Sequence, residues 1–303
     1  MKFRIPKTSA LAALFLAGAF LLAGCGGGRT AVNPDDFHIV TSFYPMYIFT
    51  RNITDGVDGV AVSNMTEPQT GCLHDYQLRP SDLAALEAAD AFVLNGAGME
   101  SFLGKVTAQY PELPLIEAAA GIPLLKDDAG EANPHVWVGI SGAITEVGNI
   151  AEGLATADPA HASAYRSNAD AYVKRLETLS MEMHDALEAL PNKKIVTFHE
   201  AFPYFAAEFG LEIVAVIERE PGSEPGAGEL ADTIRLIRET GVKALFAEPQ
   251  YAPKAARTIA NETGATVFSL DPFVTGDVDS PADSYETAMR ANLEVLKQAL
   301  GTP

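Results

Sequence analysis

Three histidines and one aspartate stand where an α/β protein would present them to a ligand. Each is predicted to lie in a loop or at the end of a strand, and none lies on the face of a predicted helix. Three imidazoles and one carboxylate form a complete tetrahedral ligand set for a divalent metal ion. The four candidate ligands are His74, His135, His199 and Asp271.

Two further residues bear on this ligand set. Glu248 also follows a predicted strand and is an alternative to Asp271 as the carboxylate ligand. Cys72 stands two residues before His74, and as a thiolate ligand it would favour Zn²⁺; we expect it to be a small buried residue instead. The other histidines, which we expect to be strand or solvated helix residues, are His38, His161 and His184.

A regular apolar stripe predicts one long helix over residues 158–190. The gaps in the stripe are three or four residues, as on one face of an α-helix. Asp158 suits the N-cap, Pro159 suits the first turn, and Pro191 ends the helix. About 33 residues at 1.5 Å each give a helix of about 50 Å. The stripe consists of Tyr165, Ala169, Tyr172, Leu176, Leu179, Met183, Leu187 and Leu190.

Strand and helix patterns alternate on both sides of this helix, in residues 37–157 and 191–303. This alternation predicts parallel α/β layers, in which ligands bind beyond the carboxyl ends of the strands. Residues 135–138 are predicted to form one of the strands. A long helix between the two halves would fix their separation. The predicted fold is therefore α/β, with two parallel-sheet lobes joined by one long rigid helix.

The first 24 residues have the pattern of a secretory signal. Basic residues precede a 13-residue apolar run, and small residues end it; the run is shorter than the ~20 residues of a membrane-spanning helix. Cys25 then follows Leu22-Ala23-Gly24, which resembles the lipobox of bacterial lipoproteins. That resemblance implies cleavage before Cys25, lipidation of its thiol and attachment to a membrane surface, with residues 25–36 as a flexible tether.

The net charge of the chain limits the classes of partner that it could bind. The chain has 303 residues and a formal charge of −19, and residues 1–24 carry three basic and no acidic side chains, so that charge becomes −22 without them. So acidic a chain argues against nucleic-acid binding, because proteins that bind nucleic acids carry basic patches. The chain has two cysteines, so lipidation of one would leave no internal disulfide.

Five segments, in this order, resemble the substrate-binding lipoproteins of bacterial zinc and manganese ABC importers, the cluster 9 or A-I group. That family implies two Rossmann-like lobes joined by one long helix, with the metal held between the lobes by His74, His135, His199 and Asp271. It also implies an extracytoplasmic monomer that hands the metal to an ABC permease and its ATPase. The segments are CLHDYQLRPSD (72–82), NPHVW (133–137), TFHEAF (197–202), FAEPQ (246–250) and SLDP (269–272).

The predicted cargo is Zn²⁺, because family members with histidine as the third ligand tend towards zinc and imidazole suits this ion. Mn²⁺ is the alternative, since residues 124–133 contain no histidine where many zinc-specific members have a histidine-rich loop. A surface adhesin is a second alternative, because the family is sometimes given that role. A zinc hydrolase is disfavoured, because Pro203 stands where the second histidine of the zincin motif would be. We therefore predict a metal receptor and not an enzyme.

Overall fold

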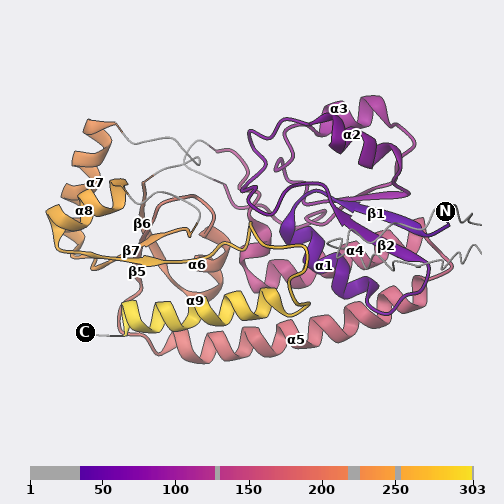
Figure 1. Ribbon diagram of the computed structural model, residues 1–303. Helices are drawn as coiled ribbons and strands as arrows, with labels where there is room; N and C mark the ends of the chain where they lie inside the picture. Colours follow the sequence, from indigo (N-terminus) through magenta and orange to yellow (C-terminus); the bar gives the residue numbers. More distant parts are fainter. Residues whose placement is uncertain (1–34, 127–129, 218–225, 250–253, 302–303) are drawn as a thin grey trace, which may run out of the picture. The chain divides into compact units, whose positions relative to one another are not determined.

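The computed structural model describes residues 35–126, 130–217, 226–249 and 254–301, which belong to one compact unit, Pro34–Pro303 (Figure 1). The predicted signal segment, Cys25 and most of the predicted tether lie outside the described residues. Within the described residues, no helix is both long enough and apolar enough to cross a membrane.

The first lobe is a parallel sheet of four strands in the order β2-β1-β3-β4. Apolar side chains on both faces of the central strands are buried, as expected when helices cover both sides of a parallel sheet. The strands are β1 (Phe37–Thr41), β2 (Val60–Asn64), β3 (Ala91–Leu94) and β4 (Leu115–Glu117), and the helices are α1 (Tyr44–Thr54), α2 (Pro80–Glu87), α3 (Leu103–Gln109) and α4 (Ile140–Ala157).

The second lobe repeats this arrangement, with parallel strands in the order β6-β5-β7-β8. The predicted fold class is therefore confirmed: two α/β lobes with parallel sheets are connected by a long helix, α5 (Figure 1). The strands are β5 (Lys194–Thr197), β6 (Glu212–Val216), β7 (Ala244–Ala247) and β8 (Thr266–Ser269), and the helices are α6 (Pro203–Phe209), α7 (Ala227–Thr240), α8 (Lys254–Thr263) and α9 (Ser284–Leu300).

The long helix α5 comprises Ala162–Glu188 and packs against α1, α4, α6 and α9 (Figure 1). Every stripe residue inside these bounds is buried, as predicted, and Leu190 packs against the core just beyond the helix. The predicted start at Asp158 was wrong, because Asp158 ends α4. Its carboxylate accepts hydrogen bonds from His161 Nδ1 at 2.6 Å and from the Tyr165 hydroxyl at 2.7 Å, which stabilises the turn between α4 and α5.

The strand predicted at 135–138 was also wrong, because Val136–Val138 form a short 3₁₀ helix, η1. This segment is fixed by contacts with distant parts of the chain. Trp137 is fully buried, and its Nε1 donates to the carbonyl of Pro272 at 2.8 Å, while the hydroxyl of Tyr285 donates to the Trp137 carbonyl at 2.8 Å. The apolar residue types indicated burial here, and tertiary hydrogen bonds decided the backbone conformation.

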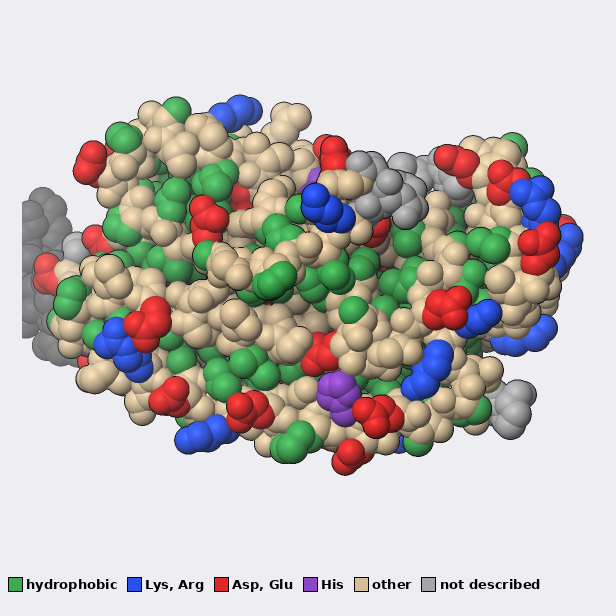
Figure 2. Space-filling view, turned by 180° about the vertical axis from the view of Figure 1, so that it is seen from behind, with side chains coloured by type: hydrophobic (Ala, Val, Ile, Leu, Met, Phe, Trp, Pro, Cys, Tyr) green, Lys and Arg blue, Asp and Glu red, His purple; other side chains and the backbone are tan. Residues whose placement is uncertain are grey.

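Two apolar clusters fill the described part of the molecule. The larger one, which we call the shared core, combines side chains of the first lobe, of α5 and α9, and of one face of the second sheet. The smaller one, which we call the outer cluster, lies between the other face of the second sheet and helices α7 and α8. Figure 2 shows Asp and Glu side chains spread over one face of the molecule, with Lys and Arg side chains interspersed.

Candidate metal centre

Cys72 and His74 lie in the loop between β2 and α2, on either side of a fully buried leucine. The backbone N–H of Leu73 contacts Met99 Sδ at 3.4 Å, and its carbonyl accepts a hydrogen bond from Ser101 Oγ at 3.4 Å. Residues on either side of a buried residue in non-helical backbone tend to point away from it. Anchoring Leu73 in the core therefore directs Cys72 and His74 towards the same side of the loop.

The chain after His74 is held by a carboxylate of α2. Asp82 Oδ2 accepts hydrogen bonds from the Tyr76 hydroxyl and from the backbone N–H of Arg79, both at 2.8 Å. The second of these bonds satisfies a donor at the start of α2. The loop that carries His74 therefore ends on a fixed helix terminus.

His135 precedes η1 and is almost completely buried, with 2% of its surface exposed. Asn133 Oδ1 lies 3.0 Å from its Nδ1 and accepts the His135 backbone N–H at 2.9 Å. Because an amide oxygen only accepts, Nδ1 carries the proton and Nε2 presents its lone pair to the site. Asn133 itself donates to the carbonyl of Glu200 at 2.8 Å, so the residue that orients His135 is tied to the second lobe.

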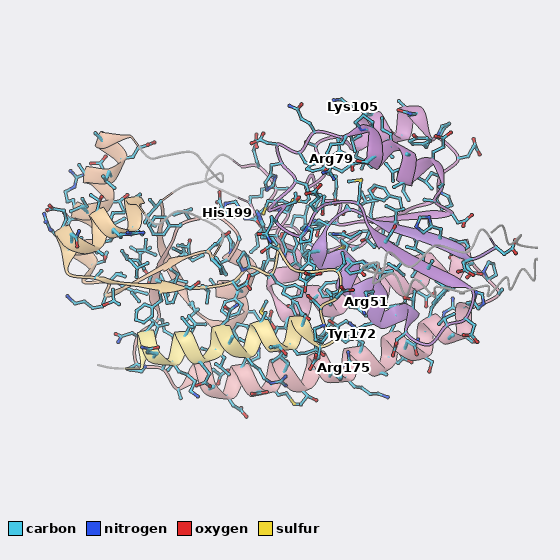
Figure 3. All side chains as sticks on the ribbon, in the orientation of Figure 1. Arg51, Arg79, Lys105, Tyr172, Arg175 and His199 are labelled. Atoms are coloured by element: carbon cyan, nitrogen blue, oxygen red, sulfur yellow. The ribbon has the colours of Figure 1, made fainter. Side chains whose placement is uncertain are left out.

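His199 follows β5 and brings the second lobe to the same point (Figure 3). It is 2% exposed, and its Nε2 lies 3.1 Å from His135 Nε2. Cys72 Sγ lies 3.4 Å from His135 Nε2 and 3.6 Å from His199 Nε2. Among the described residues, Cys72, His74, His135 and His199 form a group whose potential ligand atoms all lie within 4.8 Å of one another.

The electrostatic state of this group suits a cation. Burial lowers the pKa of His135 well below 6.5, and the neighbouring His199 and His74 lower it further, so the ring is neutral at pH 7. His74 Nε2 is buried and has no hydrogen-bond partner among the described residues. A buried ring nitrogen without a partner, in a group with two other imidazoles and a thiol, is the arrangement that a divalent metal ion would complete.

A cavity of about 310 Å³ opens onto the imidazoles. Its walls come from the first lobe and from the start of the second-lobe segment after β5. The residues that line it include His74, Gly98, Asn133, His135, His199 and Glu200.

The two predicted carboxylates follow the neighbouring strands β7 and β8, and neither belongs to the four-residue group. Asp271 is held by its surroundings: Oδ1 accepts the Phe273 N–H at 2.8 Å, and the Asp271 N–H donates to Asn292 Oδ1 at 2.9 Å. Burial raises the pKa of Glu248 well above 4.5, and the nearby Asp271 raises it further. The role of Asp271 or Glu248 as a ligand stays a prediction.

The sequence led us to expect Cys72 to be a small buried residue, whereas in the structure its sulfur lies 3.4 Å from His135 Nε2 and 3.6 Å from His199 Nε2. The signal that could have identified it is the Cys-X-His spacing around an apolar residue. That spacing puts two metal-ligating side chains on one side of the chain.

The fold and the site together define a two-lobed α/β metal-binding protein. Residues 39–299 match the family described as zinc-uptake complex component A, periplasmic, and the chain belongs to this family. The resemblance to the substrate-binding proteins of metal ABC importers is thereby confirmed.

Two relatives illustrate the match. The chain is 30% identical to the high-affinity zinc uptake system protein ZnuA of Bacillus subtilis, over 94% of this chain and 96% of that protein. It is 28% identical to the zinc-binding lipoprotein AdcA of Streptococcus pneumoniae, over 92% of this chain but only 58% of that longer protein.

Solved structures agree in fold. The substrate-binding protein FpvC of Pseudomonas aeruginosa, determined in complex with Mn²⁺, is similar with a TM-score of 0.77 and 35% identity, over 88% of this chain and 98% of that one. The laminin-binding protein Lmb of Streptococcus agalactiae is described as having adhesin and metal-transporting activity. Its structure gives a TM-score of 0.78 and 32% identity, over 87% of this chain and 99% of that one.

Proposed function

We propose that this chain is the receptor of a zinc importer, which captures Zn²⁺ on His74, His135 and His199 and delivers it to an ABC permease. The observation that carries the proposal is the convergence of these three side chains, from both lobes, with ligand atoms within 4.8 Å of one another. Membership of the zinc-uptake family supports the same function.

The donor set supports Zn²⁺ over Mn²⁺. Neutral imidazole is a good ligand for zinc, whereas Mn²⁺ prefers carboxylate, carbonyl and water oxygens. Asn133 holds His135 in the tautomer that directs the Nε2 lone pair towards the site. Residues that hydrogen-bond to metal-ligating histidines usually fix the tautomer in this way. Mn²⁺ is the alternative cargo, because FpvC is a close structural relative determined with that ion.

Metal content and calorimetric titration test the proposal directly. Protein purified without chelator should contain one zinc per chain, and His199→Ala should lose stoichiometric zinc because it removes the ligand contributed by the second lobe. His184→Ala is the matched control, since His184 lies on α5 with 37% of its side chain exposed. Full zinc content in His199→Ala, or loss of zinc in His184→Ala, would contradict the assignment.

The proposed role is capture and release, without catalysis. Catalytic zinc keeps one coordination position open for water, whereas the site here offers a fourth protein donor from either Cys72 or a carboxylate. Hydrolysis of peptide or ester panels by the zinc-loaded protein, abolished by His199→Ala, would overturn this part of the proposal.

We also propose that the receptor acts outside the cytoplasm, held to the membrane by lipid on Cys25. The supporting observations are the lipobox-like sequence before Cys25 and the relationship to a protein named as a zinc-binding lipoprotein. Cys25→Ala should abolish incorporation of a labelled fatty acid into the protein in growing cells, because it removes the thiol that lipidation would modify. Equal labelling of the variant and the wild type would count against the anchor.

A further inference from the structure

We propose that the thiolate of Cys72 is the fourth ligand, so that the site is a Cys-His₃ zinc centre and not a three-histidine, one-carboxylate centre. This inference rests on the proposed metal capture and specifies its chemistry. It assigns a ligand role to a residue of the first lobe. The first lobe would then supply three of the four ligands, Cys72, His74 and His135.

The distances from Cys72 Sγ to His135 and His199 match those between the ligands of a tetrahedral zinc ion. With Zn–S about 2.3 Å and Zn–N about 2.0–2.1 Å, tetrahedral angles separate a sulfur from a nitrogen ligand by about 3.5 Å and two nitrogens by about 3.3 Å. The corresponding separations here are 3.4 and 3.6 Å from Cys72 Sγ to the two Nε2 atoms, and 3.1 Å between the Nε2 atoms of His135 and His199. The sulfur therefore lies at a ligand's distance from both nitrogens.

The backbone holds the thiol in this position. Leu73 is fully buried between Cys72 and His74, and it is fixed by contacts with Met99 and Ser101. A site whose supporting residues are locked can present its ligands without first being ordered by the metal. The alternative ligand Asp271 already has one carboxylate oxygen engaged by the Phe273 N–H, and it is outside the four-residue group.

Coordination by Cys72 changes the selectivity of the site. As the Zn–S bond forms, the S–H bond breaks and its proton leaves to solvent, so the bound thiolate carries one negative charge, as a carboxylate ligand would. Unlike a carboxylate, a thiolate is a soft ligand, which favours Zn²⁺ and disfavours Mn²⁺. The fourth ligand then reinforces the zinc preference of the imidazoles.

X-ray absorption at the zinc edge of the zinc-loaded protein tests the assignment. The full chain with Cys25→Ser, purified in detergent, contains Cys72 as its only thiol, since the sequence has two cysteines. We expect one sulfur neighbour at about 2.3 Å and nitrogen neighbours at about 2.0–2.1 Å. Adding Cys72→Ser should remove the sulfur neighbour, whereas adding Asp271→Asn should retain it. A zinc shell without sulfur in the parent protein would overturn the inference.

Competition titrations with Zn²⁺ and Mn²⁺ provide a second readout. Cys72→Ser should weaken Zn²⁺ binding by more than the ~10–100-fold typical of losing an outer-shell partner, and it should weaken Mn²⁺ binding much less. Far-ultraviolet circular dichroism checks that the variant is folded. An unchanged ratio of Zn²⁺ to Mn²⁺ affinity would overturn the role of Cys72 while leaving zinc capture intact. Absence of zinc binding by the parent protein would instead remove the proposed function itself.

Discussion

The two lobes have the same strand order, but they bury the two faces of their sheets differently. In the first lobe, the neighbouring residues Ile39 and Val40 point to opposite faces of β1, and both belong to the shared core. In the second lobe, Ile195 of β5 belongs to the shared core, while the next residue, Val196, belongs to the outer cluster. One face of the second sheet is therefore separated from the rest of the interior.

The outer cluster is much smaller than the shared core, so the elements that cover it are held by fewer buried side chains. The outer cluster contains ten buried side chains under α7 and α8, and Ile237 is the only buried residue among the described positions of α7. The shared core includes both central strands of the first lobe and the full stripe of α5. Elements with few buried apolar contacts open at lower free energy than the global transition. We therefore expect α7 and α8 to open locally while the shared core remains folded.

Leu176→Ala should have the largest effect, because Leu176 is fully buried on α5 inside the shared core. Truncating a buried leucine costs about 2–5 kcal/mol of unfolding free energy. Urea denaturation followed by circular dichroism measures the loss. Met181→Ala is the matched control on the same helix, since Met181 is 62% exposed, and it should change stability by less than about 0.5 kcal/mol. Equal losses in the two variants would contradict the division into core and surface.

Ile259→Ala makes a comparable truncation in the outer cluster, where Ile259 of α8 is fully buried. The lost burial is worth about 2 kcal/mol or more, but we expect the loss to be local. Hydrogen exchange should accelerate in α7 and α8 and stay unchanged in α5. If exchange in α5 accelerates to the same extent, the two lobes unfold as one unit and the comparison fails.

Glu146→Gln tests a buried carboxyl group on α4, a helix with apolar side chains in the shared core. Glu146 is fully buried on α4, and neither of its carboxylate oxygens has a hydrogen-bond partner among the described residues. Burial raises its pKa well above 4.5, and the nearby Glu100 raises it further. Above pH 4.5 the unfolded state therefore loses a proton that the folded state keeps, which lowers stability by up to about 1.4 kcal/mol per pH unit.

The glutamine variant should therefore match the wild type near pH 4 and exceed its unfolding free energy by about 1–3 kcal/mol at pH 7. Glu100→Gln is the contrasting variant, because Glu100 accepts hydrogen bonds from the N–H groups of Asn95 and Gly96 and from Ser42 Oγ. Replacing one of its acceptor oxygens by an NH₂ group should destabilise the protein. Stability profiles of wild type and Glu146→Gln that run parallel between pH 4 and 7 would exclude a protonated Glu146.

Arg175→Ala should have the smallest effect of the four. Arg175, which is labelled on α5 in Figure 3, donates to Glu286 Oε1 of α9 at 2.9 Å and to Asn52 Oδ1 of α1. Its loss leaves the buried Glu286 carboxylate without this cation, at a cost of about 1–2 kcal/mol. The control is Arg166→Ala, whose partner Glu152 is 63% exposed, with an expected loss of about 0–1 kcal/mol. Thermal unfolding of the two variants measures the difference. Similar unfolding midpoints would show that the Arg175–Glu286 ion pair contributes no more than a surface ion pair.

The sequence alone predicted the elements whose signals are local. The spacing of Tyr165, Tyr172, Leu179 and the other stripe residues predicted the buried face of α5, because each turn of a helix repeats the same geometry. Short apolar runs located the strands of the two sheets and put His199 just after one of them, whereas the strand expected at residues 135–138 is a 3₁₀ helix. The start of α5 was predicted incorrectly because an aspartate before a proline suits an N-cap, whereas in the structure the Asp158 backbone N–H donates to the Leu154 carbonyl at the end of α4 and its side chain binds His161 and Tyr165.

Only the tertiary structure decided which side chains meet. Cys72 belongs to the group of potential ligands and Asp271 lies outside it, and this depends on the buried anchor at Leu73 and on how the lobes dock. The segment after β8 returns to the first lobe, where Tyr47 and Arg51 of α1 donate to the carbonyl of Val278 at 3.1 Å. Contacts across more than 200 residues leave no periodic trace in the sequence, because each depends on the placement of every element between them.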